Sequence, residues 1–212
     1  MDKILEEIGA IGIVPVIVLE KKENALALAS ALIEGGLPVA EVTFRTKAAR
    51  ESISIISKSF PDMVLGAGTV LSVEQVKVAA DAGAKYIVSP GLNSKVVEYC
   101  ITNKIPVTPG VATPTEIERA LEYGLEVVKY FPAEPLGGIN YLKAISAPYG
   151  NLSFIPTGGI DVTNLLTYLK FSRVLACGGS WMVKSDLILA GKFEEIKILT
   201  LEAVKISKMR VV

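Results

Sequence analysis

The chain has 212 residues, half of them apolar, and its 22 lysine and arginine side chains are balanced by 22 aspartate and glutamate side chains. This length and composition suit one large folded domain and argue against disorder. The balanced charge gives no reason to expect nucleic acid or an anionic membrane as a partner. The chain has no histidine, which excludes Ser-His-Asp and Cys-His catalytic groups, zinc held by histidine and a histidine general base.

The N-terminal segment and the two cysteines bear on the location of the protein. The first seven residues, MDKILEE, carry acids where a signal peptide would be apolar, and no apolar run approaches the ~20 residues that span a bilayer. Cys100 and Cys177 form no CxxC motif, so we expect both thiols to be reduced and buried. We therefore predict a cytoplasmic protein.

In chain order, residues 2–8 predict a first helix, and short β-branched runs then alternate with stretches of helical periodicity. The runs are apolar on both faces, as is typical of parallel strands covered by helices. No GxGxxG motif follows the first run, which argues against a dinucleotide-binding sheet. The predicted strands are 12–19, 39–44, 63–69, 85–90, 105–110, 126–131, 153–158 and 173–178.

Eight strands that alternate with helices predict a single (β/α)₈ TIM barrel over residues 1–212, with residues 2–8 as an extra helix at its bottom. The segments 72–75 and 113–116 have the pattern of a capping box, the second with proline at the first helical position. Three glycines stand just after predicted helices, where a left-handed residue is wanted: Gly35, Gly83 and Gly124.

Lys129 lies inside the otherwise apolar run VVKYF, residues 127–131. A buried ammonium group costs several kcal/mol unless it is paired. In an edge strand the side chain could reach solvent. A closed barrel has no edge strand, however, and polar side chains near the C-terminal ends of its strands form the active site. We therefore interpret Lys129 as a functional residue.

The second predicted strand also places polar groups in the barrel. Glu41, Thr43 and Arg45 alternate onto one face, and Thr69 follows the third strand after the glycines of GAGT. Glu41 and Arg45 could form a structural ion pair. The alternative is that a lysine, a carboxylate, a guanidinium and a hydroxyl meet at one mouth of the barrel.

Carbonyl chemistry needs this set of groups. An amine is nucleophilic in its unprotonated form, which burial favours. When it attacks a ketone, the iminium that forms accepts the electrons of an adjacent C–C bond. Glu41 would carry protons, and Arg45 would hold a carboxylate by two parallel hydrogen bonds.

Glycine pairs follow the seventh and eighth strands, as Gly158-Gly159 and as Gly178-Gly179 before Ser180. In this fold such loops, leading into helix N-termini, commonly bind phosphate through backbone N–H groups. The pairs could also serve only as tight turns. We predict a phosphate or another anion at this position.

The motifs that carry this chemistry resemble those of the 2-keto-3-deoxy-6-phosphogluconate (KDPG) and 4-hydroxy-2-oxoglutarate (KHG) aldolase family. The matching stretches occur in family order over essentially the whole chain. They are VPVIVL, EVTFRT, GAGTVL, YIVSPGL, TPGVATPTE, VKYFPAE, FIPTGGI and GGSWM.

This resemblance implies a class I aldolase of the Entner–Doudoroff pathway that needs no metal or cofactor. It would cleave KDPG to pyruvate and glyceraldehyde 3-phosphate, with KHG as a further expected substrate. Lys129 would be the Schiff-base lysine and Glu41 the acid and base, working through water. Arg45 and Thr69 would hold the pyruvate carboxylate, and Thr157 would bond near the reacting carbons.

The resemblance also implies that Phe131 packs against the pyruvyl unit and that Pro90 helps to shape the pocket. The phosphate would lie on Gly158, Gly159, Gly179 and Ser180. Members of the family are commonly trimers, so a homotrimer is expected. Two other functions stay open: a phosphate-binding sugar-phosphate isomerase or epimerase, and a catalytically silent metabolite-binding protein.

Overall fold

The computed structural model describes residues 1–210; the predicted domain ends at residue 212, and residues 211–212 lie outside the described part. Eight parallel strands form one sheet in the order β7-β6-β5-β4-β3-β2-β1-β8. The strands are β1 Ile13–Ile17, β2 Val39–Thr43, β3 Val64–Gly68, β4 Tyr86–Ser89, β5 Val107–Val111, β6 Val127–Tyr130, β7 Ser153–Pro156 and β8 Cys177–Gly179.

The sheet closes into a barrel between β7 and β8, the two strands at the ends of the order above. β8 pairs with β1, and isolated bridges join Phe154 to Val174 and Thr157 to Gly178. The predicted TIM barrel is therefore confirmed. The strand predicted at 173–178 is wrong in extent, because its first half makes only the single bridge at Val174 and the regular strand begins at Cys177.

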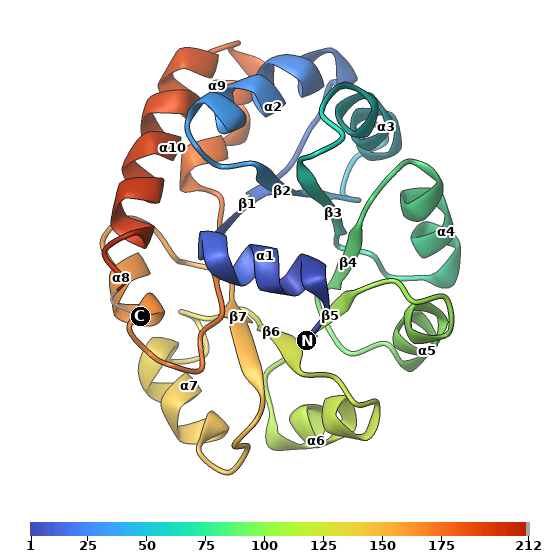
Figure 1. The fold of residues 1–212 in the computed structure, drawn as a ribbon, viewed down its shortest axis with the longest axis vertical. Helices are drawn as coiled ribbons and strands as arrows, with labels where there is room; N and C mark the ends of the chain where they lie inside the picture. The colour runs from blue at the N-terminus through green and yellow to red at the C-terminus, as the bar shows by residue number, and fades with distance from the viewer. Residues whose placement is uncertain (211–212) are drawn as a thin grey trace.

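Helices surround the barrel, one after nearly every strand, and none is long and apolar enough to cross a membrane within the described residues (Figure 1). The α-helices are α1 Lys3–Ile11, α2 Ala25–Glu34, α3 Ala49–Ser59, α4 Val73–Asp81, α5 Ser94–Thr102, α6 Pro114–Glu122, α7 Gly138–Ser146, α8 Leu165–Leu169, α9 Ser185–Leu189 and α10 Phe193–Ser207. Two short 3₁₀ helices are η1 Lys22–Asn24 and η2 Trp181–Val183.

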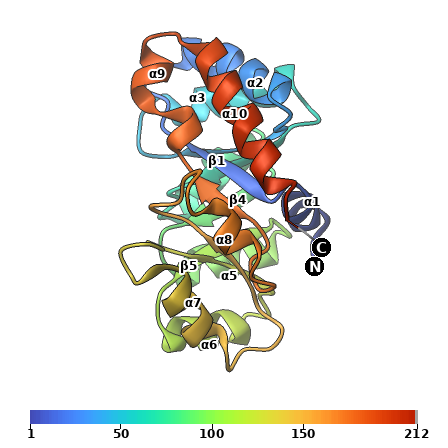
Figure 2. The ribbon, with the colours of Figure 1, turned by 90° about the vertical axis from the view of Figure 1, so that its left-hand side faces the viewer.

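Helix α1 lies across one end of the barrel, as predicted, although it extends to Ile11 (Figure 1). Asp2 caps it by accepting a hydrogen bond from the Ile4 N–H at 2.8 Å, and Ile8 points into the barrel with no exposed surface. The view turned by 90° places α1 at one side of the molecule and shows the long α10 alongside α2 (Figure 2). The bottom of the barrel is thus covered by the apolar face of α1, and a ligand must enter from the opposite end.

The helix ends follow the predicted signals with two corrections. The capping box at Thr113 and Glu116 is complete, whereas Gln75 accepts from the Leu71 N–H instead of closing the box that was predicted for 72–75. Gly83 and Gly124 are left-handed as predicted. Gly35 is not: its φ is −74°, because the chain turns one residue later, at Gly36, where φ is 81°.

Candidate active site

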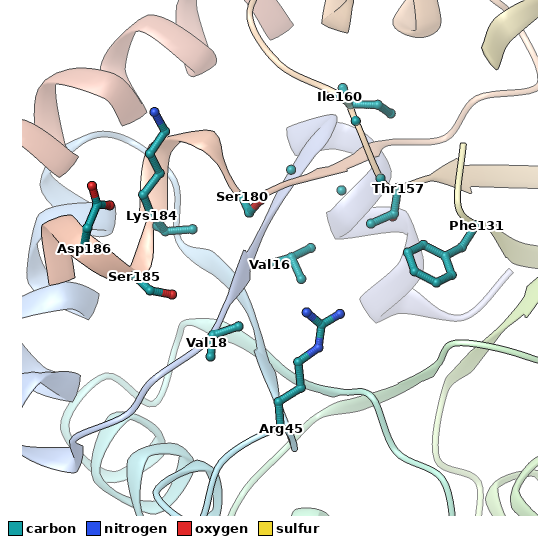
Figure 3. A pocket seen from close by; sticks show the side chains of 15 residues that line it. Val16, Val18, Arg45, Phe131, Thr157, Ile160, Ser180, Lys184, Ser185 and Asp186 are labelled. Carbon is teal, nitrogen blue, oxygen red and sulfur yellow. The ribbon is translucent and has the colours of Figure 1, made fainter. Parts of the chain in front are cut away.

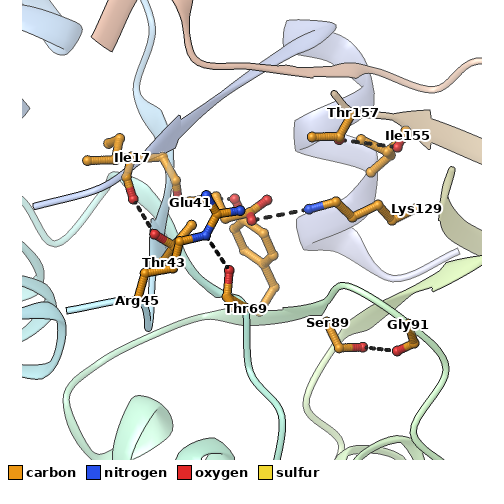
Figure 4. Close-up of polar contacts among 12 residues, drawn as sticks. Ile17, Glu41, Thr43, Arg45, Thr69, Ser89, Gly91, Lys129, Ile155 and Thr157 are labelled. Carbon is orange, nitrogen blue, oxygen red and sulfur yellow. Dashed lines mark hydrogen bonds and ion pairs between the residues drawn. The ribbon is translucent and has the colours of Figure 1, made fainter. Parts of the chain in front are cut away.

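Lys129 and Glu41 face each other inside the barrel (Figure 4). Lys129 lies on β6 in register with Gly110 and Ile155, and Glu41 lies on β2. The two side chains are 8% and 6% exposed, and the Lys129 Nζ is 3.4 Å from the Glu41 Oε1. A buried amine is therefore paired with a buried carboxylate, which offsets part of the cost of removing both from water.

Glycines on β3 make room for the carboxylate. A Cβ on Gly68 would lie 2.0 Å from the Glu41 Oε1, and one on Gly66 would lie 2.2 Å from the ring of Tyr86. The Tyr86 hydroxyl donates to the Ala40 carbonyl at 3.0 Å. Burial, with the charge of Glu41, raises the pKa of Tyr86 well above its ordinary value, so the hydroxyl stays protonated and keeps this bond.

Arg45 and Thr69 lie at the mouth of the barrel, above the ion pair. The Arg45 Nε donates to the Thr69 Oγ1 at 3.3 Å, and the guanidinium faces a cavity (Figures 3 and 4). Thr69 has a φ of 55°, a left-handed conformation that a β-branched residue rarely adopts outside functional sites. No ion pair joins Glu41 to Arg45 within residues 1–210, so the predicted structural alternative for these two residues is not found.

Above the strand ends lies a cavity of about 620 Å³ (Figure 3). A small hollow of about 10 Å³, which includes Lys129 and Glu41, lies deeper in the barrel, and Thr157 borders both spaces. The ring centroid of Phe131 is 5.2 Å from the Lys129 Nζ. Seven of the predicted site residues line the larger cavity: Arg45, Phe131, Thr157, Gly158, Gly159, Gly179 and Ser180.

The two glycine loops form one wall of this cavity. Gly158 and Gly159 are left-handed, with φ values of 103° and 80°. A Cβ on Gly179 would lie 1.8 Å from the Trp181 ring. Among the described residues, the N–H groups of Gly159 and Ser180 donate to no protein acceptor, which leaves them free to bind an anion.

The chemistry of this site agrees with the comparisons to known proteins. The family model for KDPG and KHG aldolases matches residues 4–199. The chain belongs to this family. It is 49% identical to the 2-dehydro-3-deoxy-phosphogluconate aldolase of Treponema pallidum, over 97% of this chain and 98% of that protein. It is 42% identical to the KHG/KDPG aldolase of Escherichia coli K12, over 93% of this chain and 92% of that protein.

Solved structures of aldolases in this family are close to the fold described above. A KDPG aldolase from Legionella pneumophila, with pyruvate captured as a covalent carbinolamine, has a TM-score of 0.89, 39% identity and coverage of 92% of this chain and 97% of that chain. The 2-keto-3-deoxy-6-phosphogluconate aldolase of Zymomonas mobilis with 3-phosphoglycerate has a TM-score of 0.90, 36% identity and coverage of 98% of both chains.

In this member of the aldolase family, two sequence expectations about the site differ from the structure. The glycine pair 158–159 does not lead directly into a helix, because α8 begins only at Leu165, and the second pair leads into the 3₁₀ helix η2. Pro90 lines neither of the two spaces above. It borders a separate hollow of about 420 Å³ beside Ser89 and Leu92.

Sequence reasoning missed seven residues of the aldolase cavity, although it did name Gly178 in the second glycine pair. Val16 of β1 and Val18, just after its end, alternate with Ile17 and could have been found as inward positions of the strand predicted at 12–19. The loop after β8 carries no such signal, because it folds back over the cavity only in the tertiary structure. The missed residues are Val16, Val18, Ile160, Val183, Lys184, Ser185 and Asp186.

Proposed function

We propose that the protein is a class I aldolase that cleaves KDPG to pyruvate and glyceraldehyde 3-phosphate, with KHG as a second substrate. The observation that carries this proposal is the amine of Lys129, buried and paired with Glu41 in a small hollow that lies beneath the cavity at the strand C-termini and shares Thr157 with it. Membership of the KDPG and KHG aldolase family supports the same reaction.

The pair provides the first step. Glu41, 3.4 Å away, can take a proton from the Lys129 ammonium and leave a neutral amine. The amine attacks the C2 carbonyl carbon of the keto acid, and the carbonyl oxygen gains a proton to give a carbinolamine. Glu41 then gives its proton to the carbinolamine hydroxyl, which leaves as water, and this yields the iminium that links C2 to Lys129 and a Glu41 carboxylate ready to act as a base.

The iminium makes the aldol cleavage possible. The C3–C4 bond breaks, and its electron pair moves toward the iminium nitrogen to give an enamine. The C4 hydroxyl loses its proton to Glu41, directly or through a water molecule, and the aldehyde leaves. The enamine then takes a proton at C3, and water hydrolyses the imine, which releases pyruvate and restores Lys129.

The cavity wall supplies the binding groups. Arg45 and Thr69, joined by a hydrogen bond at the mouth, would hold the carboxylate of the keto acid. Phe131 and Thr157 would pack and bond around the pyruvyl unit. At the other end, the loops that contain Gly158, Gly159, Gly179 and Ser180 would hold the phosphate through N–H groups. The 3-phosphoglycerate bound to the Zymomonas mobilis aldolase is a phosphorylated three-carbon acid.

The remaining sequence predictions stay proposals. We keep the assignment of residues 1–212 to one aldolase domain, the cytoplasmic location and the homotrimer. An exposed Leu71 at the rim of the hollow beside Pro90 is an apolar surface that a neighbouring subunit would cover. Light scattering after size exclusion would test the trimer. The isomerase and the silent binding protein are disfavoured, because neither needs a buried Lys129–Glu41 pair.

The proposed function is tested by measuring pyruvate release from KDPG and from KHG in a coupled assay. We expect the wild type to cleave both and Lys129→Met to cleave neither. A Lys85→Met variant is a matched control, because that lysine is outside the cavity and donates to the Pro61 carbonyl. Measurable cleavage by folded Lys129→Met would contradict the proposal.

A further inference from the structure

A hydrogen bond between Tyr168 and Glu134 lies next to the loop of Gly158 and Gly159, which we call the cradle. Neither residue is among the catalytic and binding residues described above. Tyr168 belongs to α8 and is only 1% exposed, and its hydroxyl donates to the Glu134 Oε1. Burial, and then the bond to Glu134, raise the pKa of Tyr168 above its ordinary value, so the hydroxyl keeps its proton. A bond of this type, from a hydroxyl to a charged carboxylate, is stronger than a neutral one.

Glu134 contacts the cradle through both its backbone and its side chain. The Ala133 N–H donates to the Thr157 carbonyl at 2.8 Å, and the Glu134 N–H donates to the Gly158 carbonyl at 3.0 Å. The Glu134 Cβ would be 2.6 Å from a Cβ on Gly159. The segment after β6 is thus joined to the loop after β7 by two backbone hydrogen bonds, and the Glu134 side chain packs against Gly159.

The segment that carries Tyr168 also bonds to the cradle. The Asn164 Nδ2 donates to the Gly159 carbonyl at 3.0 Å, and the Asp161 N–H donates to the Asn164 Oδ1 at 2.9 Å. Through Tyr168 and Glu134, α8 therefore closes a ring of bonds around Gly158 and Gly159. Two consecutive left-handed glycines have much conformational freedom to lose, so a loop of this kind needs such restraints to hold its N–H groups in place.

We propose that Glu134 and Tyr168 are positioning residues that fix the Gly158–Gly159 loop for the phosphate half of the substrate. This inference rests on the proposed aldolase function, and it divides the site into two parts. The clamp, meaning the Tyr168–Glu134 bond, sets affinity for the phosphorylated end. Lys129 and Glu41 act on the pyruvyl end without it.

The test separates these two ends. The variants are Tyr168→Phe, which removes one hydroxyl, Glu134→Ala, which removes the acceptor, and Glu134→Gln, which keeps an acceptor oxygen. Tyr123→Phe is the matched control. The Tyr123 hydroxyl donates to the Glu98 Oε1 at 2.9 Å. Because Tyr123 comes shortly before the start of β6, this bond lies at the end of the barrel opposite the cavity. Circular dichroism establishes that each variant is folded.

For Tyr168→Phe and Glu134→Ala we expect KM for KDPG to rise about tenfold, with kcat changed less than about twofold. Exchange of the pyruvate methyl protons with deuterium, which needs Lys129 but no phosphate, should stay at the wild-type rate. Glu134→Gln should retain most of the affinity for KDPG, and Tyr123→Phe should match the wild type. An equal loss in cleavage and exchange, or an unchanged KM for KDPG, would overturn the proposal.

A second measurement tests the clamp whether or not the protein is an aldolase. Inorganic phosphate should raise the melting temperature of the wild type and of Tyr123→Phe, and it should have a much smaller effect on Tyr168→Phe. Equal stabilisation of Tyr168→Phe would reject the clamp. If the wild type cleaves neither KDPG nor KHG and does not exchange pyruvate protons, the proposed function fails, while the phosphate measurement still decides the clamp.

Discussion

The buried ion pair predicts a strong coupling between two substitutions. Lys129→Met removes the ammonium but leaves the buried Glu41 with no ion-pair partner among the described residues. Breaking a buried pair in this way costs about 3–5 kcal/mol, because an uncompensated charge remains in the core. For a chain of this size, that cost should lower the melting temperature by roughly 6–20 °C.

The double substitution should recover most of this loss. Lys129→Met with Glu41→Gln places a neutral thioether beside a neutral amide of nearly the same shape as the carboxylate. Replacing both partners of a buried pair by neutral groups is often close to neutral for stability. We therefore expect the double variant to be more stable than Lys129→Met alone by about 2–4 kcal/mol, although it carries one substitution more.

Urea unfolding at pH 7, followed by circular dichroism at one protein concentration, measures this coupling. The four proteins of the cycle are the wild type, the two single variants and the double variant. The control is Lys22→Met, which breaks an exposed pair with Glu51 and should change stability by less than about 1 kcal/mol. The reasoning is refuted if Lys129→Met is as stable as the wild type, or if the double variant is no more stable than Lys129→Met.

Three further predictions follow from the same structure. Glu41→Gln should lower kcat about 10²–10⁴-fold while pyruvate can still be trapped on the enzyme, and unchanged kinetics would make Glu41 only an ion-pair partner. Burial raises the pKa of Tyr130 to about 12 and that of Tyr86 well above 10, so these phenols ionise more readily in the unfolded chain. Stability should therefore be retained below pH 10 and fall between about pH 10 and 12, and equal urea midpoints at pH 9 and 11 would contradict this. Burial also raises the pKa of the Cys100 thiol to about 11 and raises that of Cys177, so a disulfide reagent at pH 8 should label both only after denaturation; rapid labelling of the native protein would show that the thiols are accessible.

Much of the barrel could be predicted because its signals are local. Apolar strands recur at a regular spacing, and alternation along β2 and β6 places Glu41 and Lys129 on inward faces. The extent of β8 could not be predicted in this way, because the run 173–178 is uncharged after Arg173 and nothing in it marks where pairing begins, while only Cys177–Gly179 pairs with β1. The left-handed residue is Gly36 instead of Gly35 because α2 ends where it does. The sequence could not decide between them, because either glycine can adopt a left-handed conformation.

The site was predictable where a residue conflicts with its surroundings. A lysine in an apolar strand costs energy, so Lys129 stands out in the sequence, and so do the glycines that make room for Glu41. Lys184 and Ser185 carry no such conflict, because polar residues are ordinary at the start of a helix, and only the tertiary structure brings the beginning of α9 to the cavity. The bond between Tyr168 and Glu134 joins residues 34 positions apart and had no signal at all.

The central claim is that Lys129 forms a Schiff base with the substrate, and borohydride trapping tests it most directly. The protein is incubated with pyruvate, reduced with borohydride and examined by intact mass and by peptide mapping. We predict one reduced pyruvyl adduct per chain, on the peptide that contains Lys129, and none in Lys129→Met. Folded protein that forms no adduct, or forms one on another lysine, would contradict the account.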